Sequence, residues 1–260
     1  EFRADEVLVA DGLAKSFGEK RLFSGVEFKV TGGERIAITG DNGTGKSTLV
    51  KLIVGEEAPD AGYVRLGPAV KAAYLPQIVT FRDPSLSAAD TVIDECHCEM
   101  QEARDRLGAF GFTGEDALKA VGTLSGGEQS RLRLCILMRS DVNLLILDEP
   151  TNHLDIASRE WMEDALSDYS EALLFVSHDR WFIEKFATRI WHFSDGKITD
   201  FRGGFAEFRE WRARQEAIAQ AAKSAAPKQE KPKSAHKRSS ELEKQRRRVE
   251  REIEKTEARL

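Results

Sequence analysis

Residues 40–48 read Gly40-Asp41-Asn42-Gly43-Thr44-Gly45-Lys46-Ser47-Thr48, and this stretch decides the fold. It matches G-x-x-x-x-G-K-[ST], a phosphate-binding loop in which small residues let backbone N–H groups turn inward around phosphate oxygens. The loop joins an apolar run at 35–39, typical of a buried strand, to a helical pattern at 46–54. A phosphate held there also lies at the positive N-terminus of a helix. The stretch therefore predicts a nucleotide-binding α/β domain.

The polar side chains of this loop have separate expected roles. Lys46 is expected to reach the β- and γ-phosphates, and the Ser47 hydroxyl to bind Mg²⁺. The alternative is a glycine-rich turn beside an ordinary surface lysine, and the strand–loop–helix context favours the nucleotide site. The residues of the loop expected to bind ATP are Asn42, Gly43, Thr44, Gly45, Lys46, Ser47 and Thr48.

A second element supports the same chemistry. The apolar run at 144–147 ends in Asp148 and Glu149, and a similar run at 173–176 follows a predicted helix at about 156–168. Strand, helix and strand at this spacing indicate a βαβ unit with a parallel sheet. Asp148 is expected to hold Mg²⁺ and Glu149 to polarise the attacking water. Two carboxylates after a strand also occur at plain turns, but the phosphate loop in the same chain favours catalysis.

A third element is the run Leu124-Ser125-Gly126-Gly127-Glu128-Gln129, followed by a helical pattern from 130. It predicts another glycine turn at a helix N-terminus, and hence another anion site. The run resembles the signature motif of ATP-binding cassette (ABC) proteins. This resemblance implies that Ser125, Gly126, Gly127 and Glu128 act on ATP bound to an opposite cassette, so that two cassettes enclose two ATPs.

Further motifs of that family follow in order along the chain. Gln77 resembles the glutamine that touches Mg²⁺ and the attacking water, and Phe17 stands where the family has the aromatic that stacks on adenine. Asn152-His153-Leu154-Asp155 resembles the D-loop, with Asp155 facing the other cassette. His178, in Ser177-His178-Asp179, resembles the switch histidine that reaches the γ-phosphate. The resemblance implies ATP hydrolysis with Glu149, His178 and Gln77 as catalytic residues.

The runs 148–155, 177–182 and 201–208 resemble the ABC-F subfamily, and the 46 residues between Gln77 and Leu124 predict a short helical subdomain. This resemblance implies two cassettes on one chain, a second cassette in this sequence, and regulation or protection of the translating ribosome, including antibiotic resistance. Asp41 departs from the proline usual in the family and adds negative charge near phosphate. The alternatives are the ATPase subunit of a membrane exporter and a nucleic-acid-binding ATPase of DNA maintenance.

The expected fold is an α/β P-loop cassette with a RecA-like core, an antiparallel β subdomain and a short helical subdomain. We assign the cassette to 1–212, with the helical subdomain at about 78–140, a flexible linker to 213–239 and a truncated coiled-coil helix to 240–260. Apolar Leu242, Val249, Ile253 and Leu260 carry the coiled-coil pattern. A partner helix is expected from another molecule or from further chain.

Charge is unevenly spread along the chain. Residues 213–260 hold 14 Lys and Arg against 8 Asp and Glu, a formal charge of +6, whereas the whole chain is −5. A basic tail attracts phosphate backbones, and the alternative is a solvated helix face. Nucleic acid is therefore a candidate partner of the tail.

The remaining composition narrows the class of protein. Three cysteines supply no disulfide framework, which predicts a reducing, cytoplasmic location. Cys96-His97-Cys98 offers too few ligands for a tetrahedral metal site, and a plain helix is the preferred interpretation. No apolar run reaches the roughly 18 residues of a membrane span, and no signal-peptide pattern opens the chain. The absence of a starting Met leads us to expect a piece of a longer protein, or a processed or engineered chain.

Overall fold

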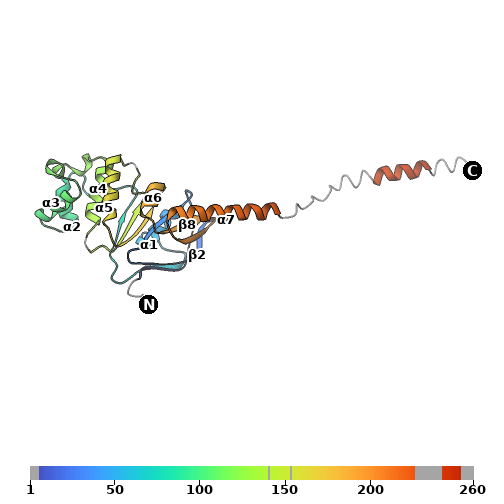
Figure 1. The fold of residues 1–260 in the computed structure, drawn as a ribbon, viewed down its shortest axis with the longest axis horizontal. Coiled ribbons are helices and arrows are strands. Elements are labelled where there is room, and N and C mark those ends of the chain that lie inside the picture. The colour runs from blue at the N-terminus through green and yellow to red at the C-terminus, as the bar shows by residue number, and fades with distance from the viewer. Residues whose placement is uncertain (1–5, 140, 153, 226–241, 253–260) are drawn as a thin grey trace, which may run out of the picture. The chain divides into compact units, whose positions relative to one another are not determined.

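Two β-sheets form the framework of the first of two compact units, which ends at Glu210 (Figure 1). The computed structural model describes residues 6–139, 141–152, 154–225 and 242–252. One sheet has three strands in the order β2-β1-β4, and the other has six in the order β5-β6-β7-β3-β8-β9. The strands are β1 (Glu6–Phe17), β2 (Lys20–Thr31), β3 (Arg35–Gly40), β4 (Ala61–Leu66), β5 (Ala72–Leu75), β6 (Leu144–Asp148), β7 (Ala172–Val176), β8 (Arg189–Ser194) and β9 (Lys197–Arg202).

The six-stranded sheet is parallel from β5 to β8, and β9 joins it antiparallel as a hairpin with β8. Every residue of β6 and β7 is buried, as expected for parallel strands covered on both faces. Helix α5 (Ile156–Ser167) connects these two strands, which confirms the predicted βαβ unit. The loops that carry Glu149 and His178 therefore emerge at the carboxyl ends of adjacent strands.

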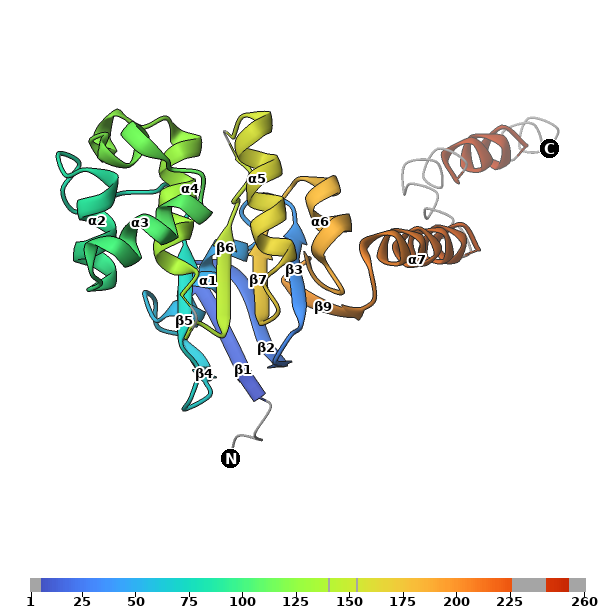
Figure 2. The same cartoon turned by 60° about the vertical axis from the view of Figure 1, so that its left-hand side comes forward.

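The main core lies between the two sheets. Strands β1 and β2 contribute Leu8, Phe23 and Phe28, and the large sheet contributes Trp191 and Phe193. The rings of Phe28 and Trp191 lie 4.3 Å apart between centroids. Helix α1 (Lys46–Val54) adds its apolar side to the same cluster. Helices α5 and α6 (Arg180–Phe186) cover the opposite face of the large sheet (Figure 2). The predicted α/β cassette fold with an antiparallel β subdomain is thus confirmed.

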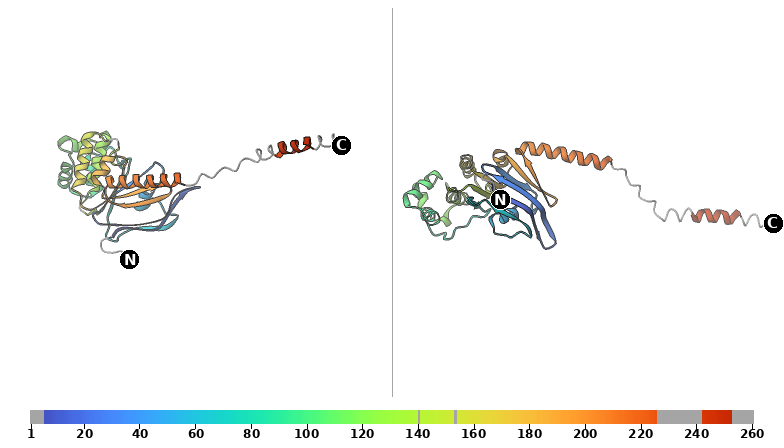
Figure 3. Two further views of the ribbon diagram at one scale, coloured as in Figure 1. Left: turned by 45° about the vertical axis from the view of Figure 1, so that its right-hand side comes forward. Right: turned by 90° about the horizontal axis from the view of Figure 1, so that it is seen from below.

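A second core belongs to a group of helices at one end of the large sheet (Figure 3). These are α2 (Ala88–Cys96), α3 (Met100–Ala109), α4 (Gly126–Leu137) and two short 3₁₀ helices, η1 (Gly114–Leu118) and η2 (Val121–Thr123). Cys96 and Cys135 are buried members of this apolar cluster, and burial raises the pKa of the Cys135 thiol to about 12. These two cysteines therefore behave as small apolar core residues.

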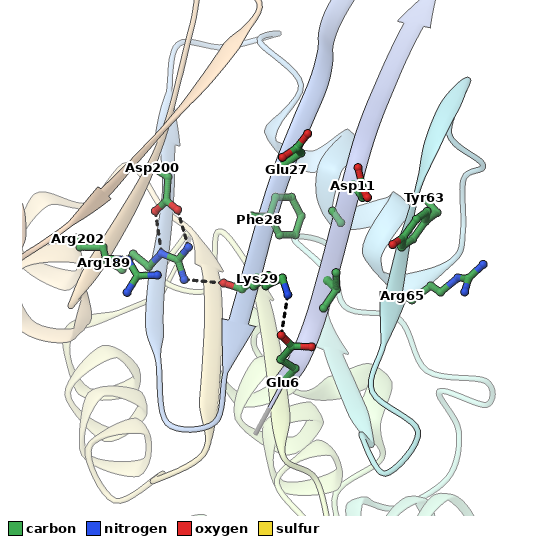
Figure 4. Close-up of a pocket in the computed structure, with 12 residues that line it drawn as sticks. Glu6, Asp11, Glu27, Phe28, Lys29, Tyr63, Arg65, Arg189, Asp200 and Arg202 are labelled. Atoms are coloured by element: carbon green, nitrogen blue, oxygen red, sulfur yellow. Dashed lines mark hydrogen bonds and ion pairs between the residues drawn. The ribbon is translucent and has the colours of Figure 1, made fainter. Parts of the chain in front are cut away.

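The buried side chain of Arg189 forms hydrogen bonds that connect the two sheets, and it lines a hollow of about 580 Å³ (Figure 4). Arg189, which is 3% exposed, donates to both carboxylate oxygens of Asp200, to Glu34 and to the carbonyl of Lys29. These bonds join β8 and β9 to β2 and to the turn before β3. Acidic and basic side chains alternate around the hollow, so it presents no single charge.

The C-terminal part differs from its expected assignment. Helix α7 (Phe205–Ala225) runs on through residues 213–225, which we expected in a flexible linker. That expectation is wrong for 213–225, because the segment is rich in Ala, which is the strongest helix former, and has no proline before Pro227. Residues 226–239 of the linker lie outside the described residues. Of the predicted coiled-coil helix, 242–252 are described and are helical. Among the described residues, no helix is long and apolar enough to cross a membrane.

Candidate functional site

The phosphate loop connects β3 to α1 through glycines in conformations that other residues avoid. Gly40 has φ +137°, and a Cβ there would lie 2.5 Å from the carbonyl oxygen of Phe193. Gly45 has φ +109° and packs against Leu22 and Phe23. Because no side chain fits at either glycine, the chain can turn tightly and present its backbone to a ligand.

Lys46 is the first residue of α1, and its side chain reaches back to the start of the phosphate loop. Its Nζ donates to the carbonyl oxygens of Gly40 and Asp41, both at 2.9 Å. The residue is 7% exposed. Burial lowers the pKa of the Lys46 amine, and the nearby carboxylates of Glu149, Asp148 and Asp41 act in the opposite direction. The ammonium is thus placed where phosphate oxygens would meet it.

Most of the predicted residues of the phosphate and catalytic motifs line one cavity of about 390 Å³. Four elements supply its walls: the phosphate loop and α1, the segment after β5, the end of β6 with the following turn, and the end of β7. The lining residues are Asn42, Gly43, Gly45, Lys46, Ser47, Thr48, Gln77, Glu149, Asn152, Val176 and His178. Residues far apart in sequence converge because the carboxyl ends of parallel strands meet at one edge of the sheet.

Asp148 does not line the cavity, but it lies beside Ser47 and Lys46, which do, and its carboxylate suits a cation. The residue is 5% exposed, and its Oδ1 has no hydrogen-bond partner among the described residues. Burial raises the pKa of Asp148, whereas a hydrogen bond from the Ser47 hydroxyl and the charge of Lys46 lower it. A buried carboxylate oxygen without a partner is costly unless a ligand satisfies it. Ser47 and Asp148 together therefore fit Mg²⁺ and its water shell.

Glu149 sits in a strained backbone position at the end of β6. Its φ is +51°, in the left-handed region that favours glycine. The Nε2 of His178 lies 3.5 Å from Glu149 Oε1, and the backbone N–H of His178 donates to Oε2 at 3.3 Å. Burial raises the pKa of the Glu149 carboxyl, and the charge and backbone N–H of His178 oppose this rise. The arrangement gives a base whose affinity for a proton is above that of an ordinary glutamate.

The signature residues lie away from this cavity, at the N-terminus of α4. The Ser125 hydroxyl accepts from the N–H of Glu128 at 3.3 Å, and the Glu128 carboxylate accepts from the N–H of Ser125 at 2.7 Å. This reciprocal capping box holds the turn open and leaves Ser125 and Gly126 exposed. None of the cavity's lining residues comes from 125–128. The structure therefore does not bring the signature to the chain's own phosphate loop.

Gly127 packs against the D-loop side of α5. A Cβ on Gly127 would lie 2.5 Å from Ser158 Oγ, so only glycine fits without movement. The Asp155 carboxylate caps α5 by accepting from the N–H of Ser158 at 2.7 Å, and this bond lowers the pKa of Asp155. Signature helix and D-loop of one chain are thus in direct contact. His153 of the D-loop lies outside the described residues.

Phe17 and Thr44, like Asp148, are expected site residues that do not line the cavity. Phe17 is 51% exposed at the end of β1, and the Nζ of buried Lys15 lies 5.2 Å from its ring centroid. The Thr44 hydroxyl donates to the carbonyl of Asp41 at 2.8 Å and so stabilises the loop from outside. Asp41 is exposed, and its carboxylate is one of the nearby charges that raise the pKa of Lys46.

Two lining residues were not predicted to line the ATP site. Asn152, the first residue of the D-loop motif, follows Glu149 by three residues, and its N–H donates to the carbonyl of Glu149 at 3.0 Å. Val176 ends β7 and accepts from the N–H of Glu149 at 2.9 Å. The position of Asn152 within the turn after two carboxylates was the available signal. Val176 gave none, because an apolar residue at a strand end has no polar pattern.

Comparison with known proteins agrees with this geometry. The ABC transporter family model matches residues 23–152. The energy-dependent translational throttle protein EttA of Escherichia coli K12 is 41% identical over 221 residues, covering 81% of this chain and 39% of that protein. ABC transporter F family member 2 of Arabidopsis thaliana is 38% identical over 207 residues, covering 78% of this chain and 30% of that protein. The chain thus spans about two fifths or less of these relatives' lengths.

Among solved structures, this chain is similar to a putative metal-chelate-type ABC transporter in an inward-facing conformation, with a TM-score of 0.66 and 22% sequence identity. The match covers 76% of this chain and 84% of that one. This likeness concerns the fold alone. The phosphate loop, the buried carboxylates, the signature turn and the family match together lead to one conclusion. The chain belongs to the ABC transporter family of nucleotide-binding cassettes and, within it, to the ABC-F subfamily.

Proposed function

We propose that this chain binds and hydrolyses ATP as one cassette of an ABC-F protein that closes on a second cassette. The observation that carries the proposal is the convergence of Lys46, Gln77, Glu149 and His178 on one cavity. Each of these side chains comes from a different loop at the same sheet edge. Such convergence places a cation, an amide, a base and an imidazole around the site of one phosphoryl group.

ATP would lie with its phosphates on the backbone of 42–48 and its adenine toward Phe17. Ser47, Asp148 and Gln77 would hold Mg²⁺, which neutralises the charge that develops on the phosphate oxygens. The unsatisfied Oδ1 of Asp148 supports this assignment. The ring of Phe17 is 51% exposed, which leaves surface on which adenine could stack.

Glu149 would orient the attacking water and accept its proton. The water oxygen bonds to the γ-phosphorus while the bond to the bridging oxygen of ADP breaks, so that ADP and phosphate leave. Lys46 and His178 stabilise the negative charge on the transferred group. Gln77 fixes the position of the water.

The exposed signature turn supports pairing with another cassette. Ser125, Gly126 and Gly127 would contact the γ-phosphate of ATP held by the partner, with Glu128 fixing the turn and Asp155 facing the partner's site. Hydrolysis would then remove those contacts and open the pair. ATP acts as a reversible clamp between two surfaces.

The names of the relatives suggest where this clamp acts. One relative is named for throttling translation, and others are named as F family members. We therefore propose that the whole protein regulates or protects the translating ribosome in the cytoplasm. These names favour this role over a membrane exporter's ATPase subunit.

Cosedimentation tests the ribosome role. The Glu149→Gln variant, which should hold ATP without hydrolysing it, is expected to pellet with ribosomes in ATP and not in ADP. Glu160→Gln, at an exposed position outside the site, is the matched control and should behave like wild type. Association that does not depend on ATP, or no association, would contradict a ribosome-directed clamp.

The basic tail supplies a further contact that can be tested separately. The helical residues 242–252 include four basic residues and one acidic residue around one surface hollow: Lys244, Arg247, Arg248, Arg251 and Glu252. We propose that they attract nucleic-acid phosphates. Deletion of 237–260 should weaken RNA binding at low salt and reduce its salt dependence, while ATP affinity is unchanged. Equal binding with and without the tail would identify a merely solvated helix.

A further inference from the structure

Two arginines on the signature helix α4 reach toward different neighbours. Arg131 and Arg133 are two residues apart, which is about 200° around an α-helix. They therefore project from nearly opposite sides. Figure 2 shows α4 between α5 on one side and the α2–α3 pair on the other.

On one side of α4, the Arg131 side chain contacts α5. Its Nη2 donates to Ser158 Oγ at 3.3 Å, and its guanidinium lies 5.6 Å from the Phe112 ring and 5.7 Å from the Trp161 ring. Ser158 is 2% exposed and leaves no room for a side chain on Gly127. Gly127 thus places the first turn of α4 against α5, and Arg131 adds a contact further along the helix.

The Arg133 side joins α4 to the segment that follows Gln77. Its guanidinium donates to the carbonyl of Thr80 and to the carboxylate of Glu95 on α2, and lies 4.3 Å from the ring centroid of Phe81. The Arg133 side chain is only 15% exposed, so water screens these contacts weakly. Thr80 follows the cavity-lining Gln77 by three residues.

We propose that Arg133 is a positioning residue that transmits the state of the chain's own phosphate site to its signature turn. The inference rests on the proposed ATP site and adds a route for regulation within it. A shift of the Gln77 segment would carry Thr80 and Phe81 with it, and Arg133 would pass that shift to α4.

The geometry favours rotation of α4 over translation. Arg133 lies six residues beyond Gly127, which is about 9 Å along the helix axis. With the first turn held at Ser158, a displacement at Arg133 tilts the helix and reorients the exposed Ser125 and Gly126. The fork of arginine is needed, because a lysine ammonium cannot hold the Thr80 carbonyl, the Glu95 carboxylate and the Phe81 ring in one geometry.

Hydrogen exchange on the 260-residue chain tests this proposal without a partner cassette. The reporters are the amides of Glu128 and Gln129, which donate to the Ser125 hydroxyl and carbonyl respectively. In a Glu149→Gln background, saturating ATP with Mg²⁺ should change their exchange rates by roughly 3- to 30-fold. Arg133→Met should reduce this change to less than about twofold, with ATP affinity and exchange in 41–49 unaltered.

Arg133→Lys keeps the charge and the fold, and it should also lose most of the ATP-dependent change in exchange. This variant therefore tests the proposal if Arg133→Met does not fold. Arg82→Met is the control, because Arg82 is 89% exposed and its ion pair reaches Asp94 rather than α4. The coupling would be overturned if both Arg133 variants showed the full ATP-dependent change in exchange. It would also be overturned if the parent chain showed no change with ATP bound. Failure of the parent chain to bind ATP would instead overturn the proposed function.

Discussion

Glu149 and His178 interact at the carboxyl ends of the neighbouring strands β6 and β7. The Oε1 of Glu149 lies 3.5 Å from the Nε2 of His178, and the backbone N–H of His178 donates to Oε2. The pair places a base and an imidazole on one side of the phosphate loop. Because β6 and β7 are adjacent in the sheet, the pairing follows from topology and not from nearness in sequence.

Glu149→Gln should abolish hydrolysis and spare binding. The amide keeps the size and the backbone conformation but cannot accept a proton, so turnover should fall by about 10²- to 10⁴-fold. Steady-state phosphate release measures the loss, and equilibrium titration with a non-hydrolysable ATP analogue should give an affinity within about twofold of wild type. Turnover close to wild type would remove Glu149 from the role of base.

The pH dependence of turnover should report the same carboxyl. Burial raises the pKa of Glu149 above its ordinary 4.5, and His178 lowers it. The base must be ionised, so turnover should fall as the pH drops through a value above 4.5. His178→Gln removes the charge that favours ionisation and should move this acid limb to higher pH, whatever its effect on the maximal rate. A limb that stays in place or moves to lower pH would contradict the pairing.

Lys46→Met should weaken ATP binding by about 10- to 100-fold, which is the loss of one charge-assisted hydrogen bond to phosphate. The ammonium has only the Gly40 and Asp41 carbonyls as hydrogen-bond partners among the described residues. Calorimetric titration with ATP measures the change, and Lys51→Met, on the same helix but exposed, is the control. Equal losses in both variants would indicate a general effect of charge and not a phosphate contact.

Gly127→Ala should disturb the joint between signature helix and D-loop. The added methyl group would meet Ser158 Oγ at 2.5 Å, so the free energy of unfolding should fall by about 1–3 kcal/mol. Gly126→Ala meets nothing within 4 Å and is the matched control. Chemical denaturation measures both, and Ser158→Gly should restore stability in the Gly127→Ala chain. A double variant no more stable than Gly127→Ala alone would place the strain elsewhere.

Much of the fold and of the candidate site was predictable because the motifs carry their own context. Lys46 follows a strand and opens a helix, and Asp148 and Glu149 end a wholly apolar run, so the parallel sheet and its active edge follow from local patterns. The order of Gln77, Glu149 and His178 along the chain then matches the order of loops at that edge.

Other features depend on packing between distant segments and leave no local signal. Neither the contact of Gly127 with Ser158 nor the bonds of Arg133 to Thr80 and Glu95 could be predicted, since each joins residues with ordinary neighbours in sequence. The helical state of 213–225 was missed because its Ala, Lys and Gln suit a linker as well as a helix. Phe17 was assigned to adenine from resemblance, and the structure places its ring outside the cavity wall.

The left-handed backbone at Glu149 implies a trade-off between the stability of the fold and the rate of hydrolysis at one residue. Glycine would adopt φ +51° at ease, whereas a glutamate there costs about 1–2 kcal/mol. Replacing Glu149 with glycine would relieve this strain and remove the proposed base. At this position the protein therefore has a less stable resting state in exchange for a chemical step.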